Sequence, residues 1–222
     1  MKPFPSEKNP DNTGKQINNL SIRIKSLAPW QKIIKRTSDL ILSFITLVIT
    51  LPVFIILAVL IGFSGKGPVI FRQERIGLNG KPFTLLKFRT MKKDAETNGP
   101  MLSNPNDPRV TPVGTFMRKH KLDEIPNFIN VLWGDMSIVG PRPERQFYLD
   151  LLRKENPEAD LLLTVKPGIT CTGQVVYGYA TDINEMIERL DYELDYVKTP
   201  SLRKDALIMW QTVLLLIRGR KE

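Results

Sequence analysis

An apolar run of 24 residues without a charged side chain, from Leu40 to Phe63, constrains the fold of this chain more than any other stretch. As one helix it would be roughly 36 Å long, which is enough to cross the hydrocarbon core of a bilayer. Pro52 lies near the middle, where it removes a backbone hydrogen bond and kinks or breaks a helix. Thr50 could help to satisfy the freed carbonyls. We therefore expect a membrane helix that is broken at Pro52.

The cations on both sides of this run bear on how it meets the membrane. They are Arg23, Lys25, Lys32, Lys35 and Arg36 before it, and Lys66, Arg72, Arg75 and Lys81 after it. A spanning helix usually has an asymmetric Lys and Arg distribution, whereas similar flanks suit a segment that enters and leaves on the cytoplasmic face. Residues 30–66 are thus predicted to form a re-entrant membrane helix, with an ordinary transmembrane anchor as the alternative. Asp39 is expected to pair with Arg36 at the interface.

The rest of the composition limits the class of protein. A chain of 222 residues allows one core of moderate size. Residues 1–29 are polar and predicted to form a flexible cytoplasmic tail rather than a cleavable signal. The formal net charge of +9 favours anionic partners, namely nucleic acid, anionic lipid or a phosphorylated substrate. A single cysteine, Cys171, and a single histidine, His120, exclude a disulfide framework and make His-based metal sites and Ser-His-Asp triads hard to build.

Two adjacent carboxylates, Asp123 and Glu124, stand between the basic run from Arg118 to Lys121 and a pattern of apolar residues at helical spacing. Pro126 is tolerated only near a first turn, which predicts that the two acids lie at a helix start. The N-terminus of a helix suits anions, phosphate included. Taken alone, however, an Asp-Glu pair is most often a solvated helix start.

Glycines and prolines then interrupt the chain and predict an extended loop that presents Arg142. Its guanidinium suits bidentate contact with phosphate, although a loop arginine is by itself a common surface residue. These helix-ending residues are Gly134, Gly140, Pro141 and Pro143.

The segment after the apolar run, GPVIFRQERIGLNGKPFTLLKFRTM, predicts a β-hairpin with a turn at Asn79-Gly80. Lys87 and Arg89 alternate with Phe88 and should share one strand face, either as phosphate ligands or as solvated cations. Further along, we expect a polar loop over residues 92–115, two amphipathic helical pieces divided at Pro157, a short strand over 169–176, and helices over 184–197 and 202–217. Trp210 and the basic end of the last helix suit a membrane interface, with a buried core helix as the alternative.

Three stretches, GPVIFRQERIGLNGKPFTLLKFRTM, LDEIPNFINVLWGDMSIVGPRPE and KPGITCTGQ, closely resemble the signature of the bacterial sugar transferase family. These are monotopic polyprenyl-phosphate phosphoglycosyl transferases, and the resemblance runs from about Lys35 to the C-terminus. It implies a single, mostly helical α/β domain with a small β-hairpin, comprising the re-entrant helix, a catalytic domain over residues 67–200 and an interfacial helix over 201–222. The implied location is the cytoplasmic face of the bacterial inner membrane.

The implied reaction transfers a sugar-1-phosphate from a UDP-sugar to polyprenyl (undecaprenyl) phosphate and releases UMP. It would be the first membrane step of exopolysaccharide, O-antigen or glycoprotein glycan synthesis. By resemblance, Asp123 is the covalent nucleophile, and Glu124 is expected to bind Mg²⁺ because two neighbouring carboxylates repel each other unless a cation is present. The residues expected to stabilise the substrate phosphates are Lys87, Arg118 and Arg142. Asp191 and Asp205 are expected as supporting acids near the pair.

One part of the chain departs from this pattern. The relatives usually carry an arginine shortly after the Gln-Val pair, whereas here Gln174 and Val175 are followed by Val176 and then Tyr177-Gly178-Tyr179. An arginine contact at that place is therefore in doubt, and the sugar, the glycan pathway and the oligomeric state, a homodimer included, stay open. A non-catalytic, membrane-tethered protein that binds anionic lipid or nucleic acid is the alternative, but no nucleic-acid-binding signature is present, so no nucleic-acid partner is expected.

Overall fold

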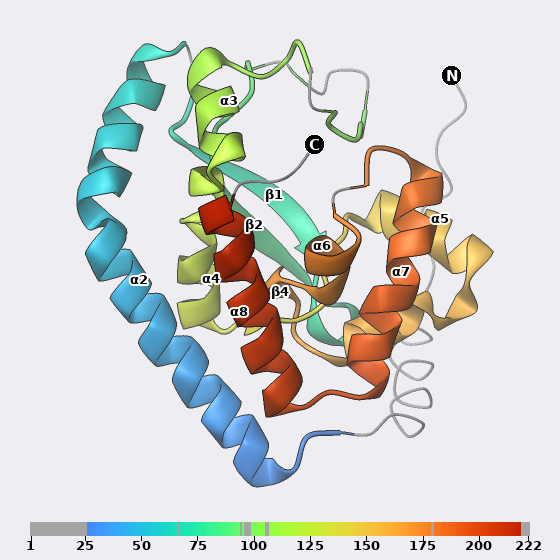
Figure 1. Cartoon of the computed structure of the whole chain (residues 1–222). Helices are drawn as coiled ribbons and strands as arrows, with labels where there is room; N and C mark the ends of the chain where they lie inside the picture. Colours follow the sequence, from blue (N-terminus) through green and yellow to red (C-terminus); the bar gives the residue numbers. More distant parts are fainter. Residues whose placement is uncertain are drawn as a thin grey trace.

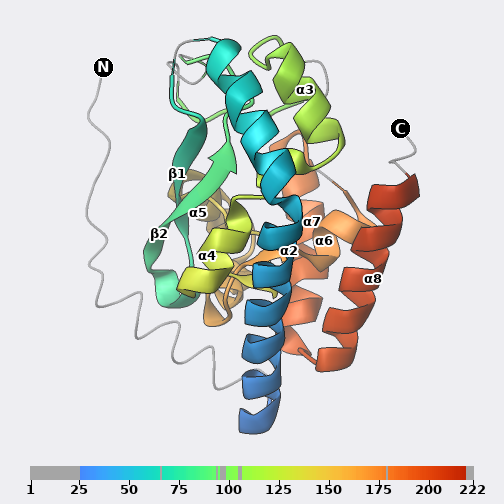
Figure 2. The ribbon, with the colours of Figure 1, turned by 90° about the vertical axis from the view of Figure 1, so that its left-hand side faces the viewer.

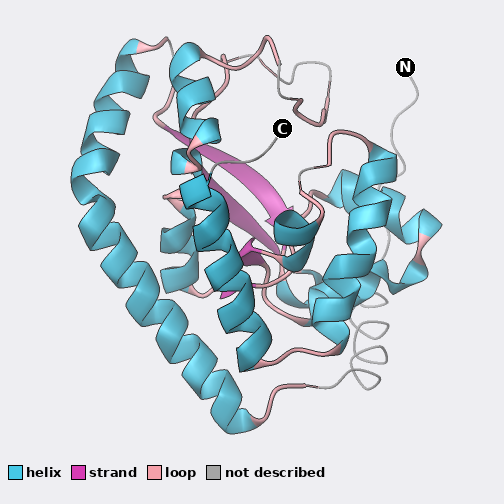
Figure 3. Cartoon of the chain, in the orientation of Figure 1, coloured by secondary structure: helices cyan, strands magenta, loops and turns pink. Residues whose placement is uncertain are grey.

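The computed structural model describes residues 26–65, 67–93, 95, 99–104, 107–178 and 180–218. Helices make up most of this part of the chain, and two small sheets lie among them (Figure 1, Figure 3). The elements in chain order are α2 (Pro29–Phe63), β1 (Ile70–Ile76), the 3-10 helix η1 (Leu78–Gly80), β2 (Pro82–Phe88), α3 (Pro112–Lys119), η2 (Leu122–Glu124), α4 (Asn127–Trp133), β3 (Ser137–Val139), α5 (Gln146–Glu155), η3 (Pro157–Thr164), β4 (Gly168–Thr170), α6 (Thr172–Val176), α7 (Ile183–Lys198) and α8 (Leu202–Arg218). The mostly helical fold with a small β-hairpin is confirmed.

The hairpin forms as its sequence predicts. β1 and β2 pair antiparallel from Ile70 opposite Phe88 to Ile76 opposite Pro82. Asn79 and Gly80 both have positive φ, 58° and 73°, which is the backbone that an Asn-Gly turn favours. The strand that returns from this turn carries Lys87.

The strand predicted over residues 169–176 is correct only at its start. β4 ends at Thr170 and pairs in parallel with β3, while Thr172 begins helix α6 with Cys171 at its N-cap. Gly173 of α6 lies so close to Arg189 and Glu193 of α7 that a Cβ atom would clash with both side chains. This packing on α7 outweighs the strand preference of the β-branched residues in the segment.

Helix α2 is a continuous α-helix of 35 residues that passes through Pro52, so the predicted break is absent (Figure 1). It is instead bent, as expected where a proline removes one hydrogen bond from the ladder. The hydroxyl of Thr50 donates to the carbonyl of Thr46 at 2.7 Å, rather than to the Val48 carbonyl that Pro52 leaves without its donor. By length and composition α2 can cross a membrane, and most of its apolar side chains are exposed.

The first turns of α2 project beyond the other described elements (Figure 2), and the helix contacts the rest of the domain from Lys35 and Arg36 onward. Near its start, Arg36 donates to the carbonyls of Val131 and Leu132 at the end of α4, at 2.7 and 3.1 Å. Asp39 does not pair with Arg36 as predicted, because its carboxylate faces β3. Near its end, Leu57 and Ile61 are buried against Phe88 and Met117, in a cluster that joins α2 to β2 and α3.

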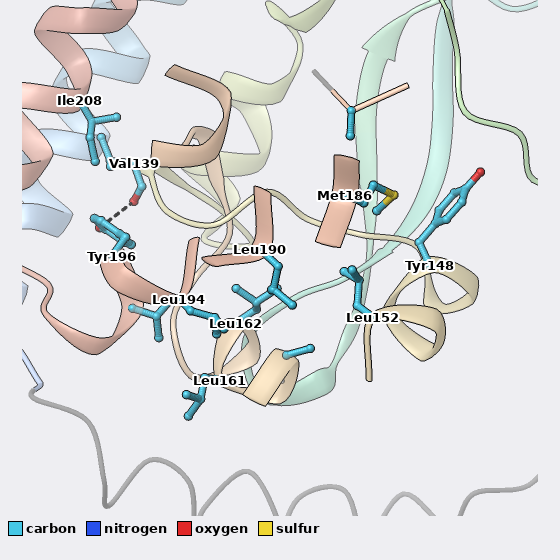
Figure 4. Packing of buried hydrophobic residues seen from close by; sticks show 13 residues of the cluster. Val139, Tyr148, Leu152, Leu161, Leu162, Met186, Leu190, Leu194, Tyr196 and Ile208 are labelled. Atoms are coloured by element: carbon cyan, nitrogen blue, oxygen red, sulfur yellow. Dashed lines mark hydrogen bonds between the residues drawn. The ribbon is translucent and has the colours of Figure 1, made fainter. Parts of the chain in front are cut away.

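The main hydrophobic core lies on the other side of the molecule, between α5, η3 and α7 (Figure 4). Its largest contributions come from leucines and tyrosines of these elements, and it extends to Val139 of β3 and Ile208 of α8. α8 buries Asp205 and Ile208 but leaves an apolar surface exposed that includes Trp210 and Leu216. Of the predicted tail (residues 1–29), residues 1–25 lie outside the described residues, as do Arg220 and Lys221, and Pro29 already belongs to α2.

Candidate active site

The site is built around the ion pair between Lys87 of β2 and Glu124 of η2. The Lys87 Nζ lies 2.7 Å from Oε1 of Glu124. Asp123 and Glu124 are each only 8% exposed, and both belong to the 3-10 turn η2 instead of the first turn of an α-helix. The predicted helix begins three residues later, at Asn127. The sequence therefore located the two acids correctly next to a helix but placed the helix start too early.

A buried asparagine, Asn130, fixes α4 to the strand that carries Lys87. Its side chain accepts a hydrogen bond from the Leu86 N–H at 3.0 Å and donates to the Thr84 carbonyl at 2.7 Å. Because the side chain is fully buried, both bonds form away from water and hold α4 in a fixed position against β2. Sequence reasoning missed this role, since the residue's partners lie more than 40 positions away.

The pKa values of the two adjacent carboxylates are shifted in opposite directions. Burial raises the pKa of Asp123 above its ordinary value, and the charge of Glu124 adds to this against the opposing charge of Lys87. Burial alone would also raise the pKa of Glu124, but the charges of Lys87, Arg142 and Lys121 outweigh it and hold that pKa below its ordinary value. Among the described residues, the Asp123 side chain makes no hydrogen bond or ion pair with another side chain. Asp123 is thus the more basic and the less engaged carboxylate of the pair.

Arg118, from α3, is aligned by two hydroxyl groups. Its Nε donates to the Thr90 hydroxyl at 2.9 Å, and one terminal nitrogen donates to the Ser103 hydroxyl at 2.6 Å. Its positive charge is close enough to Asp123 for each to affect the pKa of the other. The predicted phosphate-binding role of Arg118 is therefore compatible with its position beside the Asp123 carboxylate.

Arg142 lies in the predicted extended loop, after α4 has ended at Trp133 with Gly134 in the left-handed conformation, φ 98°. The following Glu144 accepts from Arg189 of α7 at 2.7 Å and lies 3.6 Å from a nitrogen of Arg75, so the far end of the loop is tied to two elements. The charge of Arg142 lowers the pKa values of both Glu124 and Glu193. The charge of Arg142 therefore influences an acidic side chain on η2 and another on α7.

Two residues of this region were missed by the sequence analysis. Lys121 immediately precedes η2 with a left-handed backbone, φ 57°, and burial lowers its pKa to about 8 against the opposing charges of Glu124 and Asp123. Glu193 is buried on α7, and burial raises its pKa to about 7 against the opposing effects of the neighbouring Cys171 thiol and Arg189 guanidinium. The unusual backbone of Lys121 and the burial of Glu193 leave no signal in a single sequence.

The remaining predicted residues have other surroundings. Asp205 pairs with Lys35 of α2 at 2.8 Å and accepts a hydrogen bond from the Tyr196 hydroxyl at 2.7 Å. Asp191 is exposed on α7 and makes no hydrogen bond or ion pair with another described side chain. Arg89, predicted as a phosphate ligand or a solvated cation, is instead buried and donates to the carbonyls of Ile61 and Gly65 at the end of α2, both at 2.8 Å.

The segment that departs from the family pattern lies between α6 and α7. The Tyr177 hydroxyl donates to Glu188 at 2.8 Å, Gly178 has a positive φ of 115°, and Tyr179 lies outside the described residues. In this segment the described chain thus has a half-buried tyrosine whose hydroxyl is tied to α7. His120 stacks against Phe116 at a ring distance of 4.7 Å.

Asp123 and Glu124 are the acidic side chains of this site that could bind Mg²⁺. Among the described residues, no group of three or more His, Cys, Asp and Glu side chains could hold a metal ion. Mg²⁺ commonly uses one or two protein carboxylates and completes its shell with water and substrate phosphates. Asp123 and Glu124 are two adjacent carboxylates that would fit such an arrangement.

Comparison with known proteins identifies the family. The sequence profile of the bacterial sugar transferase family matches residues 30–219, and the chain belongs to this family. It is 38% identical over 192 residues to a UDP-N-acetylgalactosamine-undecaprenyl-phosphate N-acetylgalactosaminephosphotransferase of Aeromonas hydrophila, covering 86% of this chain and 45% of the relative. It is 40% identical over 189 residues to the UDP-glucose:undecaprenyl-phosphate glucose-1-phosphate transferase of Escherichia coli K12, covering 84% and 41%.

A shorter relative matches over most of both lengths. The exopolysaccharide production protein ExoY of Sinorhizobium fredii is 33% identical over 207 residues, which cover 85% of this chain and 87% of that protein. By contrast, the chain spans less than half the length of the Aeromonas and Escherichia relatives. The resemblance noted in the sequence is thus confirmed at the level of the family.

Proposed function

We propose that this protein transfers a sugar-1-phosphate from a UDP-sugar to undecaprenyl phosphate through a phosphosugar held covalently on Asp123. The observation that carries the proposal is the difference between two neighbouring carboxylates. Glu124 is engaged by Lys87, whereas Asp123 has no ion pair among the described residues and the higher pKa. A more basic carboxylate is the better nucleophile, and covalent catalysis divides one difficult displacement into two. The names of the relatives support this substrate pair.

In the first step, an Asp123 carboxylate oxygen forms a bond to the phosphorus that carries the sugar. The phosphoanhydride bond to UMP breaks, and UMP leaves with the electron pair. In the second step, an oxygen of undecaprenyl phosphate attacks the same phosphorus, and the Asp123 carboxylate leaves. Lys87, Arg118 and Arg142 would stabilise the negative charge on the phosphoryl oxygens in both steps.

A magnesium ion is part of the proposal. Glu124, with Asp123 beside it, would hold the ion together with oxygens of the donor diphosphate. When bound, Mg²⁺ would neutralise charge on that diphosphate and favour departure of UMP. Lys87 keeps Glu124 ionised at neutral pH, because its charge opposes the effect of burial on the Glu124 pKa.

Two helices with exposed apolar side chains would suit a protein that joins a soluble donor to a lipid acceptor. α2 and α8 expose apolar side chains, including Trp30 and Ile49 on α2 and Trp210 on α8. We propose that α2 is re-entrant and that α8 lies at the interface, with the domain on the cytoplasmic face of the bacterial inner membrane. Support for the re-entrant path comes from the contacts that both ends of α2 make with one domain. The sugar stays open, since the relatives are named for glucose and for N-acetylgalactosamine.

The test uses the full chain in lipid nanodiscs with undecaprenyl phosphate, Mg²⁺ and a panel of UDP-sugars, and it measures UMP. Without the lipid acceptor, the correct donor should release about one equivalent of UMP and leave a mass increase of one sugar phosphate on the protein. The adduct should be absent in Asp123→Asn, present in the exposed control Asp150→Asn, and discharged by undecaprenyl phosphate. Turnover without a burst or an adduct would reject the covalent step. No UMP from any donor would reject the activity and favour a binding protein.

A further inference from the structure

The short strand β3 and the apolar helix α2 are joined by hydrogen bonds in both directions. β3 pairs in parallel with β4, with Ser137 opposite Gly168 and Val139 opposite Thr170. The Ile138 N–H donates to Oδ1 of Asp39 at 3.1 Å, and the Ser137 hydroxyl donates to Oδ2 of Asp39 at 2.7 Å. Asp39 is 6% exposed, at the start of the apolar run. A buried carboxylate is costly unless it is hydrogen-bonded, and here both oxygens are.

The next carbonyl of the strand, that of Val139, is bound from two further directions. It accepts from Nζ of Lys35 at 2.9 Å and from the Tyr196 hydroxyl at 3.4 Å, a contact drawn as a dashed line in Figure 4. Both donors also bind the buried carboxylate of Asp205, at 2.8 and 2.7 Å. Asp205 therefore holds two side chains, from α2 and α7, on one backbone oxygen of β3.

The strand continues directly into the loop that presents Arg142, three residues after Val139. The two residues between are packed without free space. A Cβ atom on Gly140 would clash with the Lys166 carbonyl, and the Pro141 carbonyl accepts from the Gly168 N–H at 2.8 Å. A shift of Val139 would therefore be passed on to Arg142.

We propose that Lys35, Asp39, Tyr196 and Asp205, here called the edge clamp, are positioning residues for Arg142. In this arrangement α2 is part of the active-site scaffold as well as a membrane element, because its position against β3 sets the geometry of the loop that presents Arg142. The inference rests on the proposed function, in which Arg142 binds the donor diphosphate. It gives Asp205 a role that acts through Lys35 and Val139 instead of through the Asp123 and Glu124 carboxylates.

The other explanation for Lys35 is that it serves only as one of the cations flanking the apolar run. Lys32 provides a matched control, because it lies one turn earlier on α2 and is exposed, with no hydrogen bond or ion pair to another described side chain. Lys35→Gln and Lys32→Gln remove the same charge from the same flank. Only Lys35→Gln removes a hydrogen bond to Val139.

The experiment compares wild type, Asp39→Asn, Lys35→Gln, Tyr196→Phe and Lys32→Gln in nanodiscs. It measures kcat and KM for the UDP-sugar, and amide hydrogen exchange of the peptide over residues 137–142. Asp39→Asn and Lys35→Gln should lower kcat/KM about tenfold, mainly through KM, and exchange in the peptide should become faster. Tyr196→Phe should give a smaller change in the same direction, about threefold, and serves where a charge change impairs folding. Lys32→Gln should behave as wild type in both measurements.

A second comparison repeats Asp39→Asn in an Arg142→Ala background. Because the clamp acts through Arg142, the two losses should not add, and the double variant should be about as active as Arg142→Ala alone. Full additivity, unchanged exchange in the clamp variants, or an equal loss in Lys32→Gln would each overturn the inference. A wild-type protein that releases no UMP from any donor would instead refute the proposed function, and the exchange data would still show whether the clamp holds the loop.

Discussion

The Nζ of Lys87 lies 2.7 Å from Oε1 of Glu124, and this ion pair joins the β-hairpin to the turn that contains Asp123. The side chains of Lys87 and Glu124 are only 19% and 11% exposed. The pair thus keeps one member of the two acids ionised and engaged, which leaves its neighbour Asp123 as the carboxylate available for reaction.

Removing one partner of this ion pair should destabilise the protein more than removing both. Lys87→Met leaves the Glu124 charge buried without its ammonium partner, and should lower the free energy of unfolding by about 3 kcal/mol. The double variant Lys87→Met with Glu124→Gln should recover most of this loss, because no unpaired charge remains. Chemical denaturation followed by tryptophan fluorescence measures both. Equal stability of the single and double variants would mean that water compensates the Glu124 charge.

Lys121 should make the activity sensitive to alkaline pH. Its pKa of about 8 means that the ammonium is charged below pH 8 and becomes neutral as the pH rises through 8. If its charge contributes to binding of the donor diphosphate, kcat/KM for the UDP-sugar should fall above pH 8. Lys121→Arg should extend the active range upwards, since a guanidinium does not lose its proton there. Lys121→Gln should have a low kcat/KM at every pH. If kcat/KM of this variant still fell above pH 8 as in the wild type, another group would be responsible for the titration.

Glu193 should make the folded state less stable as the pH rises. The folded state holds the proton up to a pKa of about 7, whereas an exposed glutamate in the unfolded chain loses it near its ordinary value of 4.5. The penalty is therefore absent below pH 4.5, grows between 4.5 and 7, and reaches about 3 kcal/mol above 7, at about 1.4 kcal/mol for each pKa unit. Glu193→Gln should remove it.

The measurement is the difference in melting temperature between Glu193→Gln and wild type at several pH values. The variant should be more stable at pH 8 and lose most of this advantage at pH 5. Asp191→Asn removes a charge from the exposed side of the same helix and should show no such dependence. A constant difference across this range would mean that Glu193 gains a partner when it is ionised.

Features set by neighbouring residues were predictable from the sequence. The Asn79-Gly80 turn fixes the hairpin because its residues adopt positive φ readily, and Gly134 ends α4 for the same reason. The placement of Asp123 and Glu124 next to a helix, and of Arg142 in an extended loop, also depends only on adjacent prolines and glycines.

Features set by packing were not predictable. Asp39 was assigned to Arg36 by its spacing, yet its partners in β3 lie about 100 positions away. The alternation of Lys87 and Arg89 placed both on one strand face, but Arg89 lies beyond the end of β2 and is buried at the end of α2. Pro52 predicted a break in α2, but the helix accommodates the missing bond by bending. For Asp39 and Arg89 the competing interaction comes from a distant part of the chain.

The contacts at the two ends of α2 predict its path through the membrane. A straight helix of 35 residues would extend for about 52 Å, well beyond the roughly 30 Å of a hydrocarbon core. Its start is nevertheless tied to β3 through Asp39, and its end to β2 through Arg89. Single cysteines at Ser26 and Asn79, with Cys171 replaced by Ser, should therefore both be protected from an impermeant thiol reagent in intact cells. Both should react after permeabilisation.

Pro52 removes one hydrogen bond from α2, which is bent (Figure 1), and we expect the bend to help both anchors form, so that replacing Pro52 should change the path. Pro52→Ala restores the backbone hydrogen bond and favours a straighter helix, which satisfies its own backbone and can span the bilayer. A fraction of the Pro52→Ala protein should then expose one of the two cysteines in intact cells, and turnover should fall because one anchor is lost. Val53→Ala, at the adjacent position, keeps the proline and should retain the wild-type pattern. Exposure of one cysteine in the protein with Pro52 intact would instead establish a spanning helix, and the contacts at one end of α2 would then have to be absent in the membrane.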